Sequence, residues 1–163
     1  MTTVQDGESV GDAAWDFWFA LHKAAVVLER EADRLVKDQV GLSLPMFLVL
    51  SVIDAHPGPL NQTTIVGRLG LTKSTISRSV EAGARAGWID VRPDPRSRRD
   101  RIATLTPQGT ALVRRGDAAL EGSALAVFPR ESAESTRAAT ATLRQFVESV
   151  LLEPEGVRGR APG

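Results

Sequence analysis

The side chains of this chain that could do chemistry are mostly hydroxylic or cationic, and they gather in its central part. One run of such residues consists of Thr72, Lys73, Ser74, Thr75, Ser77 and Arg78. A second run consists of Arg96, Arg98, Arg99 and Arg101. Small polar side chains allow a helix to approach base edges, and cations bind phosphates, so both runs indicate contact with nucleic acid.

Gln62 and Thr63 stand shortly before these runs, where a helix is expected to begin. The free N–H groups of a helix N-terminus can bind a phosphate. Capping of the same helix by Asn61 is an equally good interpretation, and the two are compatible.

Other kinds of chemistry find little support in the 163 residues. The chain has no cysteine, which excludes disulfides, thiolate zinc sites and thiol nucleophiles. Its two histidines, His22 and His56, are far apart, so neither a catalytic metal nor a cofactor is expected. No catalytic triad order, paired-carboxylate motif or phosphate-binding glycine loop is recognisable, so the chain is not expected to be an enzyme.

The formal net charge is zero, with 20 basic and 20 acidic residues, but the charges are unevenly distributed. Residues 1–60 carry four bases and nine acids, residues 61–101 carry nine bases and four acids, and residues 102–163 carry seven of each. The central segment is therefore a basic module flanked by acidic or neutral segments, and it is the expected binding face.

The elements that must position these residues are mainly helical. Residues 12–40 contain no Gly or Pro and have apolar residues at helical spacing, so they predict one long helix that Gly41 ends. Ser43 is the expected cap of a short second helix that begins near Pro45. Residues 61–80 predict two short helices with a turn at Gly70 and Thr72 as the second cap, which is a helix-turn-helix.

A hairpin is expected directly after the helix-turn-helix. Residues 88–92 and 102–105 predict two strands, and the arginine run between them forms the tip, as in a wing. One arginine of the tip is expected to enter the minor groove and the others to meet phosphates; a solvated charge run is the plainer interpretation. Asp94 and Asp100 are expected to hold arginines by ion pairing.

Two more helices complete the predicted chain, one from Thr106-Pro107 to about residue 127 and one over residues 131–152. The expected division is a flexible leader (1–11), an N-terminal dimerisation helix (12–42), a winged helix-turn-helix (43–106), C-terminal dimerisation helices (107–153) and a flexible tail (154–163). The fold class is mainly α with a small β-hairpin wing. The last helix has an apolar stripe that favours a dimer interface over an intramolecular core: Leu143, Phe146, Val147, Val150 and Leu151.

Aromatic residues near the N-terminus suggest a second kind of site. A pocket for an aromatic effector is one interpretation, and a dimer core, which aromatic stripes at helical spacing form more often, is the favoured one. The residues concerned are Trp15, Trp18, Phe19, His22 and Phe47.

The order of elements resembles the MarR family of bacterial transcriptional regulators, and the resemblance covers residues 12–152. It is most specific at residues 69–78 and at residues 94–109, where Leu105-Thr106-Pro107-Gln108-Gly109 fits the family's register. The resemblance implies a winged helix homodimer that binds a pseudo-palindromic operator and is released by a small, often aromatic, ligand. Two residues depart from it: Gly83, where Leu is usual, is expected to loosen or re-pack its helix, and Ser97 replaces a frequent acidic residue in the wing.

The sequence thus predicts a sequence-specific transcriptional regulator, a repressor, that binds double-stranded DNA as a homodimer. Arg78 can read a guanine or clamp a phosphate, and both roles stay open. The alternative is a winged helix protein-interaction module that does not read sequence. With no signal peptide and no apolar stretch long enough to span a bilayer, a cytoplasmic location without membrane contact is expected.

Overall fold

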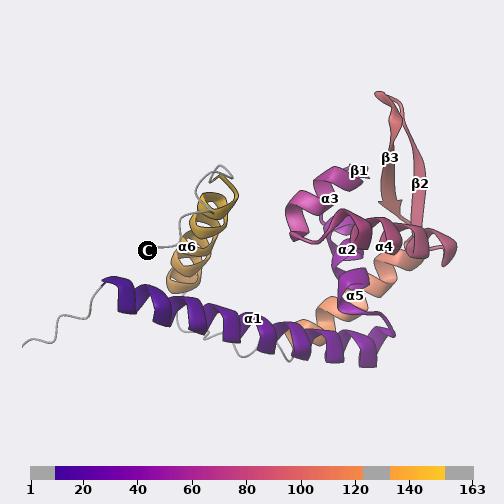
Figure 1. Cartoon of the computed structure of the whole chain (residues 1–163). Coiled ribbons are helices and arrows are strands. Elements are labelled where there is room, and N and C mark those ends of the chain that lie inside the picture. Colours follow the sequence, from indigo (N-terminus) through magenta and orange to yellow (C-terminus); the bar gives the residue numbers. More distant parts are fainter. Residues whose placement is uncertain (1–9, 123–132, 153–163) are drawn as a thin grey trace, which may run out of the picture. The chain divides into compact units, whose positions relative to one another are not determined.

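The computed structural model describes residues 10–122 and 133–152, and these fall into two compact units, Met1–Leu125 and Ala126–Gly163. The described chain is mainly helical with one small antiparallel sheet, which confirms the expected fold class. The elements of the first unit are α1 (Val10–Val40), α2 (Leu44–Asp54), β1 (Leu60–Asn61), α3 (Gln62–Leu69), α4 (Lys73–Arg85), β2 (Ile89–Asp94), β3 (Ser97–Leu105) and α5 (Pro107–Glu121) (Figure 1). The second unit contains α6 (Ala133–Leu152).

Some expected boundaries differ from those of the structure. Helix α1 already includes Val10 and Gly11, which were expected in the leader; the rest of the leader and the tail of residues 154–163 lie outside the described residues. Helix α5 ends at Glu121 with Gly122 as its C-terminal cap, earlier than the expected end near residue 127. Residues 123–127 themselves lie outside the described part of the chain.

The core of the first unit is formed by apolar residues of all five of its helices together with the sheet, and Val36 of α1 is fully buried in it. Phe47 is 2% exposed, and Leu50, Ile65, Ile76 and Val113 are buried with it. A Cβ on Gly116 would lie 2.1 Å from Cε2 of Phe47, so α5 approaches α2 as closely as it does because this residue has no side chain. The core therefore holds the winged helix-turn-helix against α5.

Side chains cap the helices of the first unit, and one cap differs from the expectation. Asn61 accepts a hydrogen bond of 2.9 Å from a backbone N–H of α3, and Thr106 accepts one of 3.2 Å from a backbone N–H of α5, as their positions predicted. Ser43 was expected to cap α2, but its side chain makes no capping hydrogen bond. Instead, Oδ1 of Asp33 in α1 accepts the N–H of Leu44 at 2.8 Å, so the cap of α2 comes from another helix.

The C-terminal end of α4 explains the departure at Gly83. The helix ends in a Schellman motif, which has two hydrogen bonds. The N–H of Trp88 donates to Gly83 O at 2.9 Å, and the N–H of Gly87, whose φ is +78°, donates to Ala84 O at 3.1 Å. A Cβ on Gly83 would lie 2.7 Å from Cδ1 of Ile89, the first residue of β2. The glycine thus re-packs this helix end by making room for Ile89.

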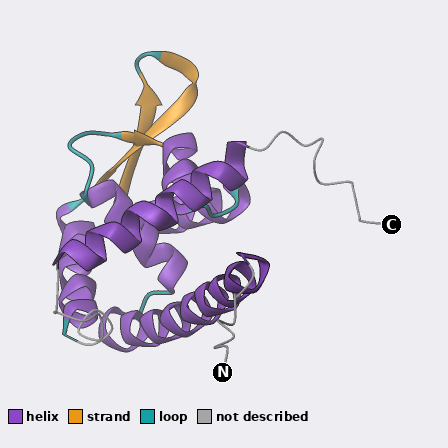
Figure 2. Ribbon diagram, turned by 90° about the vertical axis from the view of Figure 1, so that its left-hand side faces the viewer, coloured by secondary structure: helices purple, strands orange, loops and turns teal. Residues whose placement is uncertain are grey.

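The sheet has three antiparallel strands in the order β1-β3-β2, one more than the expected hairpin (Figure 2). The two long strands form the wing, with Ile89 opposite Leu105 and Pro93 opposite Arg101. The additional strand β1 has only two residues, and its Asn61 lies opposite Ile102. This short pairing fixes the beginning of α3 beside the wing.

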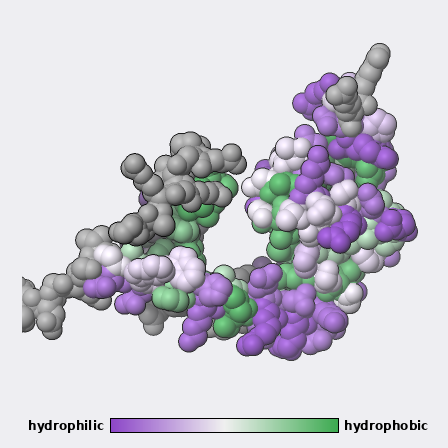
Figure 3. Space-filling view, in the orientation of Figure 1, coloured by the Kyte–Doolittle hydropathy of each residue, from purple (hydrophilic) through white to green (hydrophobic). Residues whose placement is uncertain are grey.

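Apolar side chains are exposed on α1 and on α6, each taken within its own unit. On α1, Trp15 is 62% exposed, and Trp18 and Phe19 are also exposed. On α6, Val147 and Leu151 are exposed by 52% and 76%, and Figure 3 shows hydrophobic residues on this helix. No single helix within residues 10–122 and 133–152 is long and apolar enough to cross a membrane; α1 and α2 reach the required length and hydropathy only when taken together across an 80° bend.

Three carboxylates, those of Asp54, Asp117 and Glu121, lie near one another where α5 passes the end of α2. Thr110 Oγ1 donates to Oδ1 of Asp54 at 3.2 Å, which ties the two helices. Partial burial raises the pKa of Asp117, and repulsion from Glu121 and Asp54 raises it further. The charged form of Asp117 is therefore disfavoured in the folded state.

Candidate nucleic-acid interface

The helix-turn-helix consists of α3 and α4, and its turn is built from local signals in the sequence. Gly70 ends α3 in a left-handed conformation with φ +65°, and its N–H donates to Val66 O at 2.9 Å. Thr72 begins α4, because its Oγ1 accepts the N–H of Thr75 at 3.2 Å. Ile65 and Ile76 are both fully buried and lock the two helices together. The outer face of α4 is thereby left free for a ligand.

That outer face carries the residues expected to meet DNA. Lys73, Ser74 and Arg78 are exposed, while Thr75 and Ser77 are half-buried. Arg78 Nε donates to the carbonyl oxygen of Ser74 at 3.3 Å, so the guanidinium folds back along the helix towards the preceding turn. Its remaining N–H groups can still donate to a base edge or to a phosphate.

An acidic residue on the same helix was missed by the reasoning from sequence. Ser77 Oγ donates to Oε1 of Glu81 at 3.2 Å, and Glu81 is itself exposed. The spacing of four residues, which brings side chains together on a helix, was the signal that could have found it. A carboxylate at this place can accept a hydrogen bond from cytosine N4, and it repels phosphates.

The wing differs in detail from the expectation. Strand β3 begins at Ser97, so Arg98, Arg99 and Arg101 belong to the strand, and only Arg96 lies in the turn. Arg96 and Arg101 are exposed. Oδ1 of Asp94 accepts the backbone N–H of Arg96 at 2.9 Å, a contact that shapes the turn and differs from the expected pairing with an arginine side chain.

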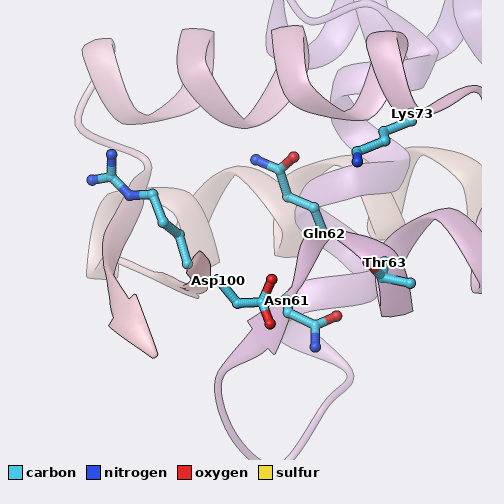
Figure 4. A pocket seen from close by; sticks show the side chains of 6 residues that line it. Asn61, Gln62, Thr63, Lys73 and Asp100 are labelled. Atoms are coloured by element: carbon cyan, nitrogen blue, oxygen red, sulfur yellow. The ribbon is translucent and has the colours of Figure 1, made fainter. Parts of the chain in front are cut away.

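A polar cavity of about 260 Å³ lies where the wing meets the helix-turn-helix. Its lining comes from the start of α3, the start of α4 and strand β3, and consists of Asn61, Gln62, Thr63, Lys73, Asp100 and Arg101. In Figure 4 the side chains of Gln62 and Lys73 lie in the upper part of the view, and those of Asp100 and Asn61 lie side by side below them. The structure therefore brings together Gln62, Thr63, Lys73 and Arg101, which the sequence offers only as separate candidates.

The five residues of the expected aromatic pocket do not lie together. Trp18 and His22 are stacked, with ring centroids 5.6 Å apart and planes 5° apart, and Phe19 meets Trp18 edge-on at 5.0 Å. Trp15 joins them, 6.0 Å from Trp18. Phe47 lies instead in the core of the first unit, so it is not on a surface that a ligand could reach.

Comparisons with known proteins agree with this architecture. The model of the MarR family matches residues 40–100. A MarR family transcriptional regulator from Streptomyces coelicolor in complex with DNA is similar, with a TM-score of 0.72, 24% identity, and coverage of 87% of this chain and 89% of that one. A MarR family regulator from Silicibacter pomeroyi gives a TM-score of 0.73 at 18% identity, covering 90% and 95% of the two chains.

A third structure, CouR from Rhodococcus jostii bound to p-coumaroyl-CoA, has a TM-score of 0.69 at 19% identity and covers 85% of this chain and 94% of its own. No curated protein sequence matches. The fold and the candidate site define the class, a winged helix-turn-helix protein. The MarR family model matches the segment of residues 40–100, which contains the helix-turn-helix, and the similar chains of known structure include MarR family transcriptional regulators.

Proposed function

We propose that the protein is a sequence-specific DNA-binding transcriptional regulator, a repressor, that binds a pseudo-palindromic operator. The observation that carries the proposal is the outer face of α4, which exposes hydroxyl groups and cations. This face lies beside the polar cavity that Lys73 and Arg101 line. In this arrangement α4 enters the major groove and presents Ser74, Ser77 and Arg78 to base edges, while cations of the wing meet phosphates. A protein-docking surface would instead present exposed apolar anchors.

The operator is bound by a homodimer. The exposed apolar side chains of α1 and of α6 support this, because large apolar surfaces are usually covered in a stable assembly. Val147→Asp places a charge on the apolar face of α6, and the variant should sediment as a monomer where the unaltered chain sediments as a dimer. An unaltered chain that is monomeric at micromolar concentration contradicts the dimer.

A small aromatic ligand releases the DNA by stabilising a dimer whose recognition helices have the wrong separation. The stacked pair of Trp18 and His22 offers a flat aromatic surface for such a ligand. A phenolic acid should quench the tryptophan fluorescence and release operator DNA, and Trp18→Ala should abolish both effects. If the acid does neither with the unaltered chain, the aromatic group is dimer core.

Selection of bound sequences from random duplex DNA at fixed salt tests the central proposal. An enriched palindrome with two equal half-sites is the expected result; enrichment of nothing favours the protein-interaction module. Arg78→Ala should change the preferred base at one position of each half-site, whereas the control Arg114→Ala, on the exposed side of α5, should leave the profile unchanged. An unchanged profile for Arg78→Ala assigns that residue to phosphate binding.

A further inference from the structure

The connection between α1 and α2 is a short elbow whose angle needs support from outside it. Only residues 41–43 join the helices, and the two helices are bent by 80°. Gly41 turns the chain with φ +73° and donates its N–H to Lys37 O at 3.0 Å, a bond that belongs to α1 alone. Val36 of α1 is fully buried in the core of the unit, and two side-chain hydrogen bonds add to this packing on either side of the elbow.

The first bond is the cap that α1 supplies to α2. Asp33, half-buried and about two turns before the end of α1, accepts the N–H of Leu44 at 2.8 Å. A carboxylate at a helix N-terminus is favoured by the exposed N–H groups and by the helix dipole. Because Ser43 makes no such bond, the α2 terminus takes its side-chain cap from the helix on the other side of the elbow.

The second bond runs from α5 to the end of α1. Arg115 Nη2 donates to the carbonyl oxygen of Gln39 at 2.6 Å, where a cation is favoured by the helix dipole. The next residue of α5, Gly116, packs on the ring of Phe47 in α2. Arg115 therefore links α5 to the last turn of α1, and Figure 1 shows that α5 passes beside this end of α1.

We propose that Asp33 and Arg115 are positioning residues that hold the elbow at one angle, and that this angle selects the spacing between operator half-sites. The second part rests on the proposed function: if α1 lies at the dimer interface, the elbow decides how far apart the two α4 helices stand. A half-site spacing near one helical turn of DNA then fits only one elbow angle. Both bonds lie outside the buried core, so their loss widens the range of angles that the packing of Val36 permits and leaves the winged helix folded.

Operators whose half-sites are moved apart or together by one to three base pairs test the second part. The unaltered chain should prefer one spacing. Asp33→Ala and Arg115→Ala should each reduce this preference by about five- to tenfold, the effect of losing one capping interaction, while affinity for a duplex with a single half-site stays unchanged. Asp33→Asn keeps an acceptor oxygen and should keep the preference.

The control is Arg34→Ala, because the ion pairs of Arg34 with Glu31 and Asp38 lie within α1 and do not cross the elbow. This variant should prefer the same spacing as the unaltered chain. If Asp33→Ala and Arg115→Ala also keep the full spacing preference, the proposal is overturned.

A measurement without DNA tests the angle by itself. The chain has no cysteine, so Lys23→Cys on α1 and Arg85→Cys on α4 give one spin-label pair per chain, measured with labelled chains diluted in unlabelled ones. Asp33→Ala should broaden the distance distribution, and Arg34→Ala should leave it narrow. An unbroadened distribution in Asp33→Ala refutes the fixed angle; absence of any preferred operator for the unaltered chain refutes the proposed function instead.

Discussion

The cavity between α3, α4 and β3 gives a quantitative prediction for the double variant Lys73→Ala/Arg101→Ala. Both cations line this cavity and are exposed, so each is assigned one DNA phosphate. A homodimer then loses four phosphate contacts. Each contact contributes about 0.9 to the slope of log affinity against log salt, so the slope should become shallower by about 3.6.

The same relation gives the loss of affinity. Relative to the unaltered chain, the double variant should bind about three and a half orders of magnitude more weakly near 0.1 M salt, with the difference vanishing towards about 1 M. Fluorescence anisotropy with a labelled duplex over a salt series measures both quantities, and a duplex of unrelated sequence serves as well because phosphate contacts are sequence-independent.

Arg114→Ala is the matched control, since it also removes an exposed arginine but lies on α5. Its slope should equal that of the unaltered chain. If the double variant keeps the full slope, neither cation meets a phosphate, and the assignment of this cavity to the DNA backbone is wrong.

Two further predictions concern stability, measured by urea unfolding at fixed protein concentration. Gly116→Ala should lower the free energy of unfolding by about 1–3 kcal/mol because the added Cβ overlaps the ring of Phe47, whereas Gly67→Ala, in open space on α3, should raise it by about 0.5–1 kcal/mol; equal effects would contradict the close packing. Asp117→Asn should raise the free energy of unfolding at pH 7 by less than about 0.5 kcal/mol. The pKa of Asp117 is raised in the folded state, so the protein loses stability as this carboxyl group ionises, and the asparagine does not ionise. This increase in the free energy of unfolding should vanish below the ordinary pKa of an aspartate, where Asp117 is protonated. An increase that persists at such a pH would show that the charge of Asp117 is not its cause.

The parts of the fold that sequence predicts well are those coded by neighbouring residues. Asn61, Thr72 and Thr106 each cap a helix within three residues of themselves, so a short window contains the whole signal. The helix-turn-helix follows from such signals together with apolar spacing. The contact between Ser77 and Glu81 is equally local, because the two residues are four positions apart on one helix.

The parts that sequence predicts poorly depend on partners far away in the chain. Asp33 caps a helix that begins eleven residues later, and nothing near it marks this role. Strand β1 has two residues and forms only because Leu60 meets Ala103. Phe47 was grouped with the aromatic residues of α1 by type, whereas its burial depends on a glycine in α5, Gly116.

The position of the arginines in the wing illustrates the same limit for a functional site. Their composition indicates DNA, but whether they occupy a loop or a strand depends on how far the pairing of β2 and β3 extends. Because Asp94 lies opposite Ser97, the turn is confined to two residues and the arginine run becomes mostly strand.

Acidic residues within the basic module give the last prediction, which concerns discrimination between DNA sequences. Asp100 lines the same cavity as Lys73 and Arg101, and its charge opposes any phosphate that enters. At about 4 Å in water one unit charge contributes about 1 kcal/mol, so Asp100→Asn should strengthen binding to unrelated duplexes by up to about fivefold per protomer at low salt. Operator binding gains no more than this, so the ratio of specific to non-specific affinity does not rise. Asp16→Asn, on the exposed part of α1, removes the same charge away from the cavity and should change neither affinity. Equal effects of the two substitutions would mean that overall charge, and not the placement of Asp100, limits non-specific binding.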